Sequence, residues 1–523
     1  MKTVYLMLRV GLWILVMLLA TDPPSSVAAP PAGEVKTVAP TLGNGVPIPY
    51  LDLSHCNDWM QLLCDNLVGC TPQGALSPDL GLAHKWEMSP DGLTWTFFLK
   101  KGIKFHDGIE VSAKDVKFSI EQLMRPDSLS GKAADIRGDV KNIEVKDPYT
   151  VIIHCKRPSI FMASILSSME SPSGMVVPKD YYERVGKDEF AKHPIGSGPY
   201  KWHSQQIGGF IKLEATDKHW RDGVPRYKYM TYLIIPEEST RLAMLRTGEA
   251  DITRISKDGV KEALNAGLSV LTKESAAAVV LHANMQWTSP VFSDIRFRKA
   301  LNLAINKEAI IKQLFAGLAK PMANWPGSTI FAVGADRTLK PYGYDPQEAR
   351  RLIKEGGWEG HEFTLVSYDR AGCPEFPLVV EAVAGFWQKI GLNPRIRISE
   401  WSTWREAARE RKSQNSVNGY DDTTNPEASS ILIKMKQKWY FKDSRSTVNI
   451  PELNERFERI EKSKDIIEIS KLMVDIYRYA YDQYLMIPIC EIPEKIVITQ
   501  RVPMWDPGLR RNDRNYNDLI RQR

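Results

Sequence analysis

Hydrophobic and polar positions alternate most regularly between residues 82 and 124. From Leu93 to Leu99 apolar side chains fall, with one exception, on every second residue with threonines between them, which predicts a half-buried strand. The turn sequence Ser-Pro-Asp-Gly at residues 89–92 precedes this strand. Apolar residues then recur at helical spacing after Ser112, a good N-cap, until Pro126 ends the helix. We therefore expect extended segments followed by an amphipathic helix.

The second half of the chain carries both helical and strand patterns. Residues 297–314 have apolar side chains at helical spacing throughout, which predicts a single amphipathic helix. Residues 363–366, 378–390 and 395–399 follow the order strand, helix, strand, and such a βαβ unit implies parallel strands joined by a right-handed crossover. A further strand is expected at residues 279–284, where the chain enters this region.

The N-terminus has the pattern of an export signal. Lys2 and Arg9 precede an apolar run from Val10 to Ala20, which is too short to span a bilayer, and small residues follow it. We expect residues 1–29 to be a cleavable signal peptide. No cysteine lies near the expected cleavage site, so a lipoprotein anchor is not expected, and no later stretch is long and apolar enough to cross a membrane.

Length and composition indicate a multidomain globular protein. A chain of 523 residues exceeds what one hydrophobic core holds, so two or three domains are expected. The hydrophobic content is 43% and the charged content is 25%, and the formal net charge of +6 is spread along the chain. Without clustered basic runs, a nucleic-acid partner is not expected.

All six cysteines lie after the expected signal, where disulfides are permitted. Their spacing does not resemble a zinc site, and the sequence leaves their pairing open. We expect one or two bridges and otherwise buried free thiols among the six, which are Cys56, Cys64, Cys70, Cys155, Cys373 and Cys490.

Motifs that carry catalysis are missing from the sequence. There is no HExxH pair, no Walker A loop, no CxxC and no nucleophile elbow. The loop Gly196-Ser197-Gly198 lacks the elbow's spacing and is expected to be a structural turn, and His106 is expected to be a turn residue. We therefore expect no enzyme activity, no cofactor and no metal.

Several of these segments together resemble one known family. The order Trp86, Asp91-Gly92, Phe97, Phe105 and Asp107-Gly108 is similar to the signature of the periplasmic solute-binding proteins of dipeptide, oligopeptide and nickel ABC importers, the extracellular solute-binding protein family 5. The resemblance extends over most of residues 42–508. It continues through the loop at residues 194–200, LRTGEADI at residues 245–252, FRKALNLAINKEAI at residues 297–310 and the helix start Asp345-Pro346.

The resemblance implies an α/β fold with mixed sheets, in which two lobes are joined by a hinge. This is the type II periplasmic-binding-protein-like fold in its three-domain, peptide-binding variety. It implies a core of lobe 1 from residues 30–74, 196–279 and 497–523, with an inserted domain at residues 75–195. Lobe 2 would comprise residues 280–496. The two strand crossings between the lobes would form the hinge.

The resemblance also implies where a ligand would bind. Glu400-Trp401 is similar to the pair with which peptide binders build an aromatic wall of the pocket. Aligning Pro426 on the proline of peptide binders puts Asp422 at their amine-binding carboxylate, with Gly419 where they carry Trp and Tyr420 as a substitute. Arg370 lies near the position where some peptide binders bind the ligand carboxylate.

The function implied is that of the soluble substrate-binding component of an ABC importer. It would capture a small peptide or peptide-like solute and deliver it to the permease and ATPase of the inner membrane. The protein is expected to be a periplasmic monomer. Two alternatives stay open, namely a non-peptide cargo such as a nickel chelate, an oligosaccharide or an opine, and a secreted hydrolase.

Overall fold

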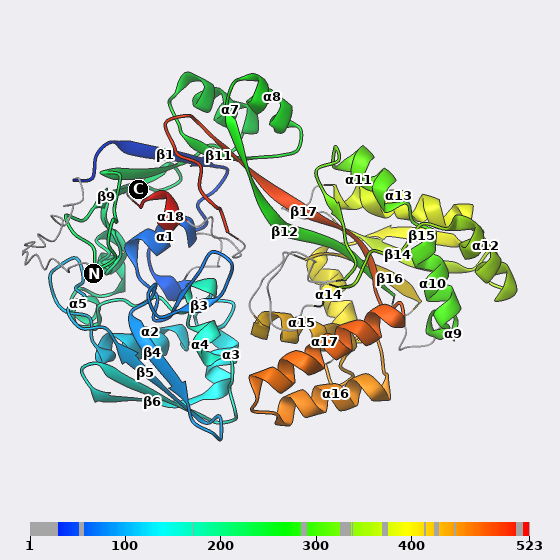
Figure 1. The fold of residues 1–523 in the computed structure, drawn as a ribbon, viewed down its shortest axis with the longest axis horizontal. Helices are drawn as coiled ribbons and strands as arrows, with labels where there is room; N and C mark the ends of the chain where they lie inside the picture. Colours follow the sequence, from blue (N-terminus) through cyan, green and yellow to red (C-terminus); the bar gives the residue numbers. More distant parts are fainter. Residues whose placement is uncertain are drawn as a thin grey trace, which may run out of the picture.

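Two lobes joined by a pair of long strands make up the computed structural model of this protein (Figure 1). The structure describes residues 30–508 and 516–521, except 52–56, 171, 284–289, 325–335, 337, 369–374, 413–414, 423–427 and 444–445. Within these residues no helix is long and apolar enough to cross a membrane. The expected signal peptide lies outside the described residues.

The N-terminal lobe is built around a mixed sheet. Strand β1 pairs in parallel with β10 and β11, and β10 continues antiparallel through β9 to β8. The strands are β1 (Glu34–Ala39), β8 (Tyr200–Gln206), β9 (Phe210–Ala215), β10 (Tyr229–Ile234) and β11 (Ile252–Ile255). The remaining elements of this lobe are η1 (Pro49–Leu51), α1 (Asn57–Leu63), β2 (Gly69–Cys70), β3 (Leu76–Ser77), α5 (Lys179–Val185), α6 (Lys187–Lys192), α7 (Glu238–Thr247), α8 (Gly259–Asn265) and α18 (Tyr516–Leu519).

A separate four-stranded sheet lies below this sheet in the view of Figure 1, in the order β4-β5-β7-β6. Its elements are β4 (Ala83–Met88), β5 (Thr94–Leu99), β6 (Val140–Asp147), β7 (Thr150–Cys155), α2 (Ala113–Leu123), α3 (Ala133–Asp139), α4 (Met162–Ile165) and η2 (Ser168–Glu170). The predicted strand and helix are confirmed. Trp95 and Phe97 are buried in its core, and the Asp115 carboxylate accepts the backbone N–H of the cap residue Ser112 at 2.9 Å.

The C-terminal lobe contains the predicted βαβ unit. Strands β14 (Glu362–Ser367) and β15 (Asn393–Ile398) pair in parallel around α13 (Phe376–Lys389), and β16 (Ser416–Asp422) joins β14 on its other side. The other elements are α9 (Pro290–Ser293), α10 (Ile295–Leu303), α11 (Lys307–Leu314), β13 (Lys320–Pro321), α12 (Pro346–Glu355), α14 (Trp401–Arg409), α15 (Ala428–Trp439), α16 (Pro451–Lys462) and α17 (Ile466–Asp482).

The single helix predicted over residues 297–314 is wrong. The structure has two helices there, α10 and α11, separated by a short break. Asn306 makes the break because its side chain accepts the backbone N–H of Ala309 at 2.8 Å and so caps the second helix. Apolar periodicity continues across the break because both helices pack on the same core, which includes Leu301 and Ile310.

Two crossing strands connect the lobes. β12 (Ser269–Ala283) and β17 (Ile487–Ile498) pair antiparallel over most of their length. At one end β17 pairs with β11 of the N-terminal lobe, and at the other end β12 pairs with β16 of the C-terminal lobe. One sheet therefore runs through both lobes, and the register of the two crossing strands shifts twice, between Lys273 and Ala277 and between Val279 and Val280.

The cysteines in the described part of the chain form no bridge with one another. Cys64, Cys70, Cys155 and Cys490 are free and buried, which agrees with the expected free thiols. Cys56 and Cys373 lie outside the described residues, so the expectation of one or two bridges stays a prediction.

The loop Gly196-Ser197-Gly198 is held by backbone contacts and by His106. A Cβ added at Gly196 would lie 2.0 Å from the Leu63 carbonyl oxygen, so α1 leaves no room for a side chain. His106 Nδ1 accepts the Gly196 N–H at 3.2 Å, and its Nε2–H donates to the Gly198 carbonyl at 2.9 Å. Burial lowers the pKa of His106 to about 4, because it disfavours the charged ring. The ring is neutral in this arrangement, since Nδ1 must be unprotonated to accept a hydrogen bond.

Acidification should destabilise the fold through His106. Between pH 6.5 and 4 the unfolded chain binds a proton at this residue that the folded chain does not, so stability is present above pH 6.5 and is lost as the pH falls. The loss is up to roughly 3 kcal/mol. His106→Gln should be less stable at pH 7 but should flatten this part of the pH profile in denaturant melts. The exposed His84→Gln serves as control, and an unchanged slope in His106→Gln would contradict the assignment.

Candidate functional site

Two of the four predicted ligand positions lie on β16, the strand that pairs with the crossing strand β12. Trp401 is the first residue of α14, and Tyr420 and Asp422 end β16. In the strand register Tyr420 pairs with Val280 and Asp422 pairs with Ala278, both on β12. Two of the predicted positions are therefore neighbours on one strand at the hinge. Arg370 lies outside the described residues.

Gly419, which the resemblance aligned with a Trp of peptide binders, has no space for a side chain. A Cβ at this position would lie 1.9 Å from Cζ of Phe376 on α13. The hydroxyl of Tyr368 donates to the Gly419 carbonyl at 3.2 Å, and the Tyr368 ring packs against Phe376 with centroids 4.9 Å apart. The rings of Phe376 and Tyr368 therefore pack on the face of β16 that α13 covers. They leave room only for glycine at position 419 of the strand.

The lobes touch through contacts that sequence reasoning missed. Lys132, the N-cap of α3, donates from Nζ to the Ser429 hydroxyl on α15 at 3.1 Å, and both residues are buried. Phe161 packs against the cores of both the four-stranded sheet and the α15–α17 layer. A further contact between the lobes is an ion pair, in which Lys257 Nζ lies 3.6 Å from Glu375 Oε1. Ser429 follows Asp422 by seven positions, so Lys132 reaches the segment that begins with the predicted amine ligand.

A buried basic pair lies behind the hinge strand. His282 of β12 pairs in register with Asn418 of β16, and its Nε2 lies 2.8 Å from Nζ of Lys438 on α15. Burial first, and the nearby ammonium second, hold the pKa of His282 well below its usual range. The neutral ring therefore accepts a hydrogen bond at Nε2 from the lysine ammonium.

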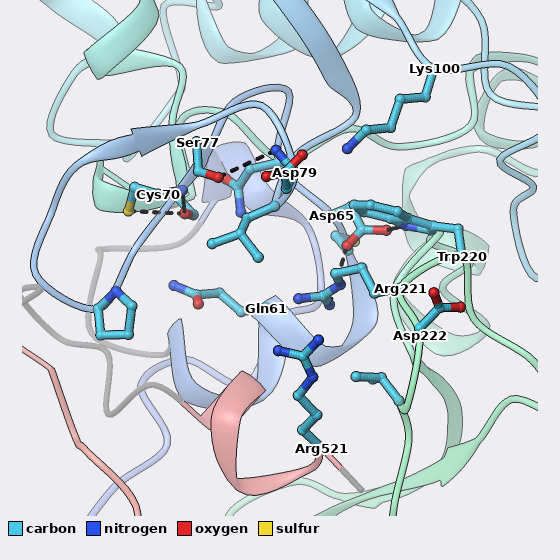
Figure 2. Close-up of a pocket in the computed structure, with 16 residues that line it drawn as sticks. Gln61, Asp65, Cys70, Ser77, Asp79, Lys100, Trp220, Arg221, Asp222 and Arg521 are labelled. Carbon is cyan, nitrogen blue, oxygen red and sulfur yellow. Dashed lines mark hydrogen bonds and ion pairs between the residues drawn. The ribbon is translucent and has the colours of Figure 1, made fainter. Parts of the chain in front are cut away.

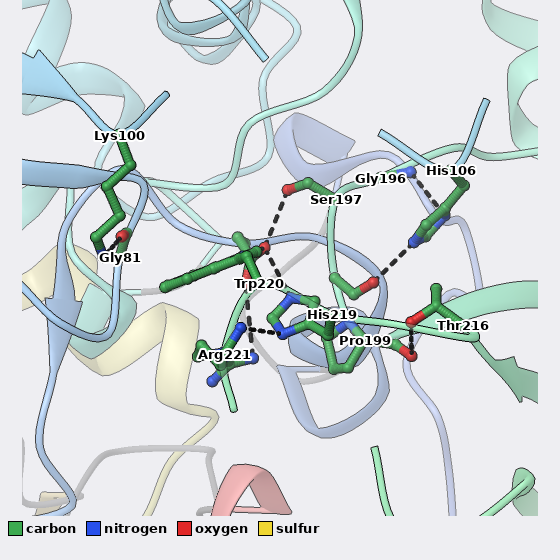
Figure 3. A network of polar contacts seen from close by, with 12 residues as sticks. Gly81, Lys100, His106, Gly196, Ser197, Pro199, Thr216, His219, Trp220 and Arg221 are labelled. Atoms are coloured by element: carbon green, nitrogen blue, oxygen red, sulfur yellow. Dashed lines mark hydrogen bonds and ion pairs between the residues drawn. The ribbon is translucent and has the colours of Figure 1, made fainter. Parts of the chain in front are cut away.

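A polar network lies in the N-terminal lobe around the buried Asp65. Figure 3 shows its partners Ser197, His219 and Trp220. The Asp65 carboxylate accepts from Trp220 Nε1 at 2.8 Å, from the Ser197 hydroxyl at 3.1 Å and from His219 Nε2 at 3.3 Å. Burial raises the pKa of Asp65, but His219, Arg221 and Trp220 outweigh it, so the pKa lies below its ordinary value. Because His219 Nδ1 accepts the Arg221 N–H at 3.2 Å, the His219 ring is neutral with its proton on Nε2.

The network lines a cavity of about 710 Å³ that opens between α1, the β2–β3 hairpin and the turn at residues 220–224 (Figure 2). Lys100, Arg221 and Arg521 reach this cavity from three different segments. Within the described part of the chain no group of His, Cys, Asp and Glu side chains has the arrangement of a metal site. The Asp65 carboxylate has a structural role, since its Oδ2 accepts hydrogen bonds from Ser197 in one segment and from His219 and Trp220 in another.

Comparison with known proteins identifies the class to which this architecture belongs. The family described as "Bacterial extracellular solute-binding proteins, family 5 Middle" matches residues 77–440. The chain is a member of the bacterial extracellular solute-binding proteins of family 5.

Two curated relatives illustrate the similarity in sequence. The glutathione-binding protein GsiB of Salmonella paratyphi A (strain ATCC 9150 / SARB42) is 31% identical over 353 residues, which is 66% of this chain and 66% of that protein. The glutathione-binding protein GsiB of Pectobacterium atrosepticum is 32% identical over 296 residues, 55% of this chain and 54% of that protein. The matched region therefore spans 66% of the first relative's length and 54% of the second's.

Solved structures share the fold at low sequence identity. HbpA2 from Haemophilus parasuis has a TM-score of 0.82 at 19% identity and covers 94% of this chain and 100% of its own. NikA from Brucella suis, in complex with Fe(III)-EDTA, has a TM-score of 0.77 at 21% identity with the same coverage. DppA from Helicobacter pylori, in complex with peptide STSA, has a TM-score of 0.67 at 22% identity and covers 94% of this chain and 98% of its own. The predicted periplasmic-binding-protein fold is confirmed.

Gly419→Ala should destabilise the C-terminal lobe. The added Cβ overlaps the Phe376 ring, and relieving such overpacking costs about 1–3 kcal/mol. Gly385→Ala in α13 is the control, because a Cβ there meets nothing within 4 Å and Ala favours a helix by about 0.5–1 kcal/mol. Denaturant unfolding midpoints should therefore move in opposite directions, and a neutral Gly419→Ala would contradict the packing described here.

Lys132→Met should loosen the contact between lobes. It removes the charged hydrogen bond to Ser429, an interaction worth roughly 1.5–3 kcal/mol, while keeping most of the side-chain volume. Small-angle X-ray scattering of the cargo-free protein should give a larger radius of gyration than for the wild type. The exposed Lys141→Met is the matched control. Identical scattering from Lys132→Met and wild type would show that this contact does not hold the lobes together.

Proposed function

We propose that this protein is the soluble binding component of an ABC importer. It captures a small peptide or peptide-like solute between its lobes and delivers it unchanged to a permease and its ATPase in the inner membrane. The observation that carries the proposal is the pair of crossing strands, β12 and β17, with the predicted ligand positions on the strand next to them. Membership of the solute-binding family supports the same conclusion.

Closure of the lobes around cargo would follow from differential affinity. A cargo that contacts both lobes binds the closed state better than the open state and shifts the population toward it. The register shifts in the crossing strands interrupt regular pairing, which makes them suitable places for bending. In this proposal the hinge lies at the lobe boundaries expected from the sequence, and residues 280–496 move together as lobe 2.

The ligand roles proposed for the C-terminal lobe are those of a peptide clamp. Asp422 would accept the free α-amine of the cargo, since a buried ammonium needs a charged acceptor. Trp401, with Tyr420 beside it, would form an apolar wall. Arg370 would bind the cargo carboxylate. The Lys132 side chain would complete the site from the opposite lobe, because it reaches the segment after Asp422.

The compartment and assembly proposed are those of an exported binding protein. Residues 1–29 would be removed on export, and the mature protein would act as a periplasmic monomer without a lipid anchor. Catalysis is not part of the proposal, because the buried rings of His106 and His219 are neutral and hydrogen-bond to the Gly198 carbonyl and to Asp65.

A non-peptide cargo is the second candidate, and Gly419 favours it. The Phe376 ring fills the space that the tryptophan of peptide binders would need, so the pocket wall differs from theirs. Among the solved neighbours, one is in complex with Fe(III)-EDTA and another with agropinic acid. Screening should therefore include metal chelates and opines beside peptides.

A cargo screen with matched variants tests the proposal. Glutathione, di- to tetrapeptides, nickel chelates and opines should be scanned by thermal shift, where a hundredfold excess over Kd stabilises by about 2.7 kcal/mol. Asp422→Asn should weaken a peptide hit by roughly tenfold or more, because an amide cannot neutralise the ammonium. Asp421→Asn, one residue earlier on the same strand, should bind like the wild type.

The outcomes separate the candidates. Equal Kd values for Asp422→Asn and wild type with a peptide hit would remove the amine assignment and leave the binding function. Binding of chelates or opines alone would favour the second candidate. If no solute of any class shifts the melting temperature, the transport proposal fails.

A further inference from the structure

Two apolar residues of the N-terminal lobe pack into the core of the opposite lobe. Ile160 and Phe161, which precede α4 and are called the wedge below, lie half-buried against the apolar core of the α15–α17 layer. Phe161 also packs on the core of its own four-stranded sheet. Among the described residues, the apolar core that Ile160 packs against is that of the C-terminal lobe. The core of one lobe is therefore completed by a side chain from the other.

The buried Ser159 holds the wedge in place from within its own lobe. Its N–H donates to the Gly92 carbonyl at 3.1 Å, and its carbonyl accepts from Trp95 Nε1 at 2.7 Å. Its hydroxyl donates to the Asp139 carboxylate at 3.0 Å. These three bonds connect the wedge to the turn before β5, to β5 itself and to the end of α3. Because the wedge is positioned by its own lobe, it loses little conformational freedom when it packs on the other lobe.

Further contacts between the lobes lie along the same seam. The helix α4 packs on α15, and the buried Lys132 Nζ donates to the Ser429 hydroxyl of α15 at 3.1 Å. A Cβ built on Gly92 would lie 3.9 Å from Cγ of Lys464, in the loop between α16 and α17. In Figure 1 this seam lies below the crossing strands. The lobes are thus joined at the hinge and again at the seam, and opening about the hinge has to separate the seam.

We propose that the wedge is a latch that favours the closed arrangement of the lobes before cargo binds. The contacts at the seam are made by the chain itself, so their contribution to closure does not depend on cargo. Opening would expose the wedge and the apolar face that receives it to water, which is unfavourable. A cargo that enters between the lobes meets only the opened fraction of the protein, so the latch slows its association. This inference rests on the hinge motion of the proposed function and not on the identity of the cargo.

The test uses the mature protein without added cargo, refolded from denaturant so that no solute stays bound. Ile160→Ser removes the apolar contact with the C-terminal lobe and leaves the core of its own sheet intact. Small-angle X-ray scattering should then give a larger radius of gyration than for the wild type. Ile109→Ser is the matched control, because Ile109 is 49% exposed on the same part of the N-terminal lobe. Its scattering should equal that of the wild type.

Hydrogen exchange in the same samples separates a latch from ordinary packing. In Ile160→Ser the amides of α15 should exchange about tenfold faster, because the helix loses its partner across the seam, while those of β5 keep the wild-type rate. The latch is overturned if Ile160→Ser scatters and exchanges like the wild type. It is also overturned if β5 and α15 accelerate together, since the wedge would then only stabilise the fold. No cargo enters this test, so a failed cargo screen would leave its result standing.

Discussion

The pairing of β12 with β17 is the constraint on which the architecture depends. The two strands are the backbone connection between lobes, and their ladder continues into β11 on one side and β16 on the other. Alternate residues of β12 are buried on opposite faces, Val279 and Leu281 under α10–α13 and Ala278 and Val280 under α15–α17. Because a one-residue slip would exchange these faces, the register of the hinge is strongly specified.

Buried histidines in this protein act as neutral linkers. His106 and His219 each donate from Nε2 and accept at Nδ1, and burial lowers the pKa of both rings. A neutral imidazole with both nitrogens bonded satisfies two polar groups without the cost of burying a charge. The two rings thereby fix the Gly196–Gly198 loop against α1, and with it the wall of the cavity in the N-terminal lobe.

The proposed cargo site would span the lobes, so its affinity would depend on the hinge and on cross-lobe contacts such as that of Lys132 with Ser429. A cargo that contacts both lobes would favour the closed arrangement by its differential affinity.

The sequence by itself determined the elements whose cause is local, namely the β5 strand, the Ser112 helix start and the βαβ unit, and by resemblance the bilobal fold. Tertiary structure alone decided three things. Asn306 broke a helix whose apolar period runs on, because both halves face one core. The Phe376 ring fixed Gly419 as a glycine. Lys132 met Ser429 across hundreds of residues, because such a contact arises from packing and leaves no periodic trace in the chain.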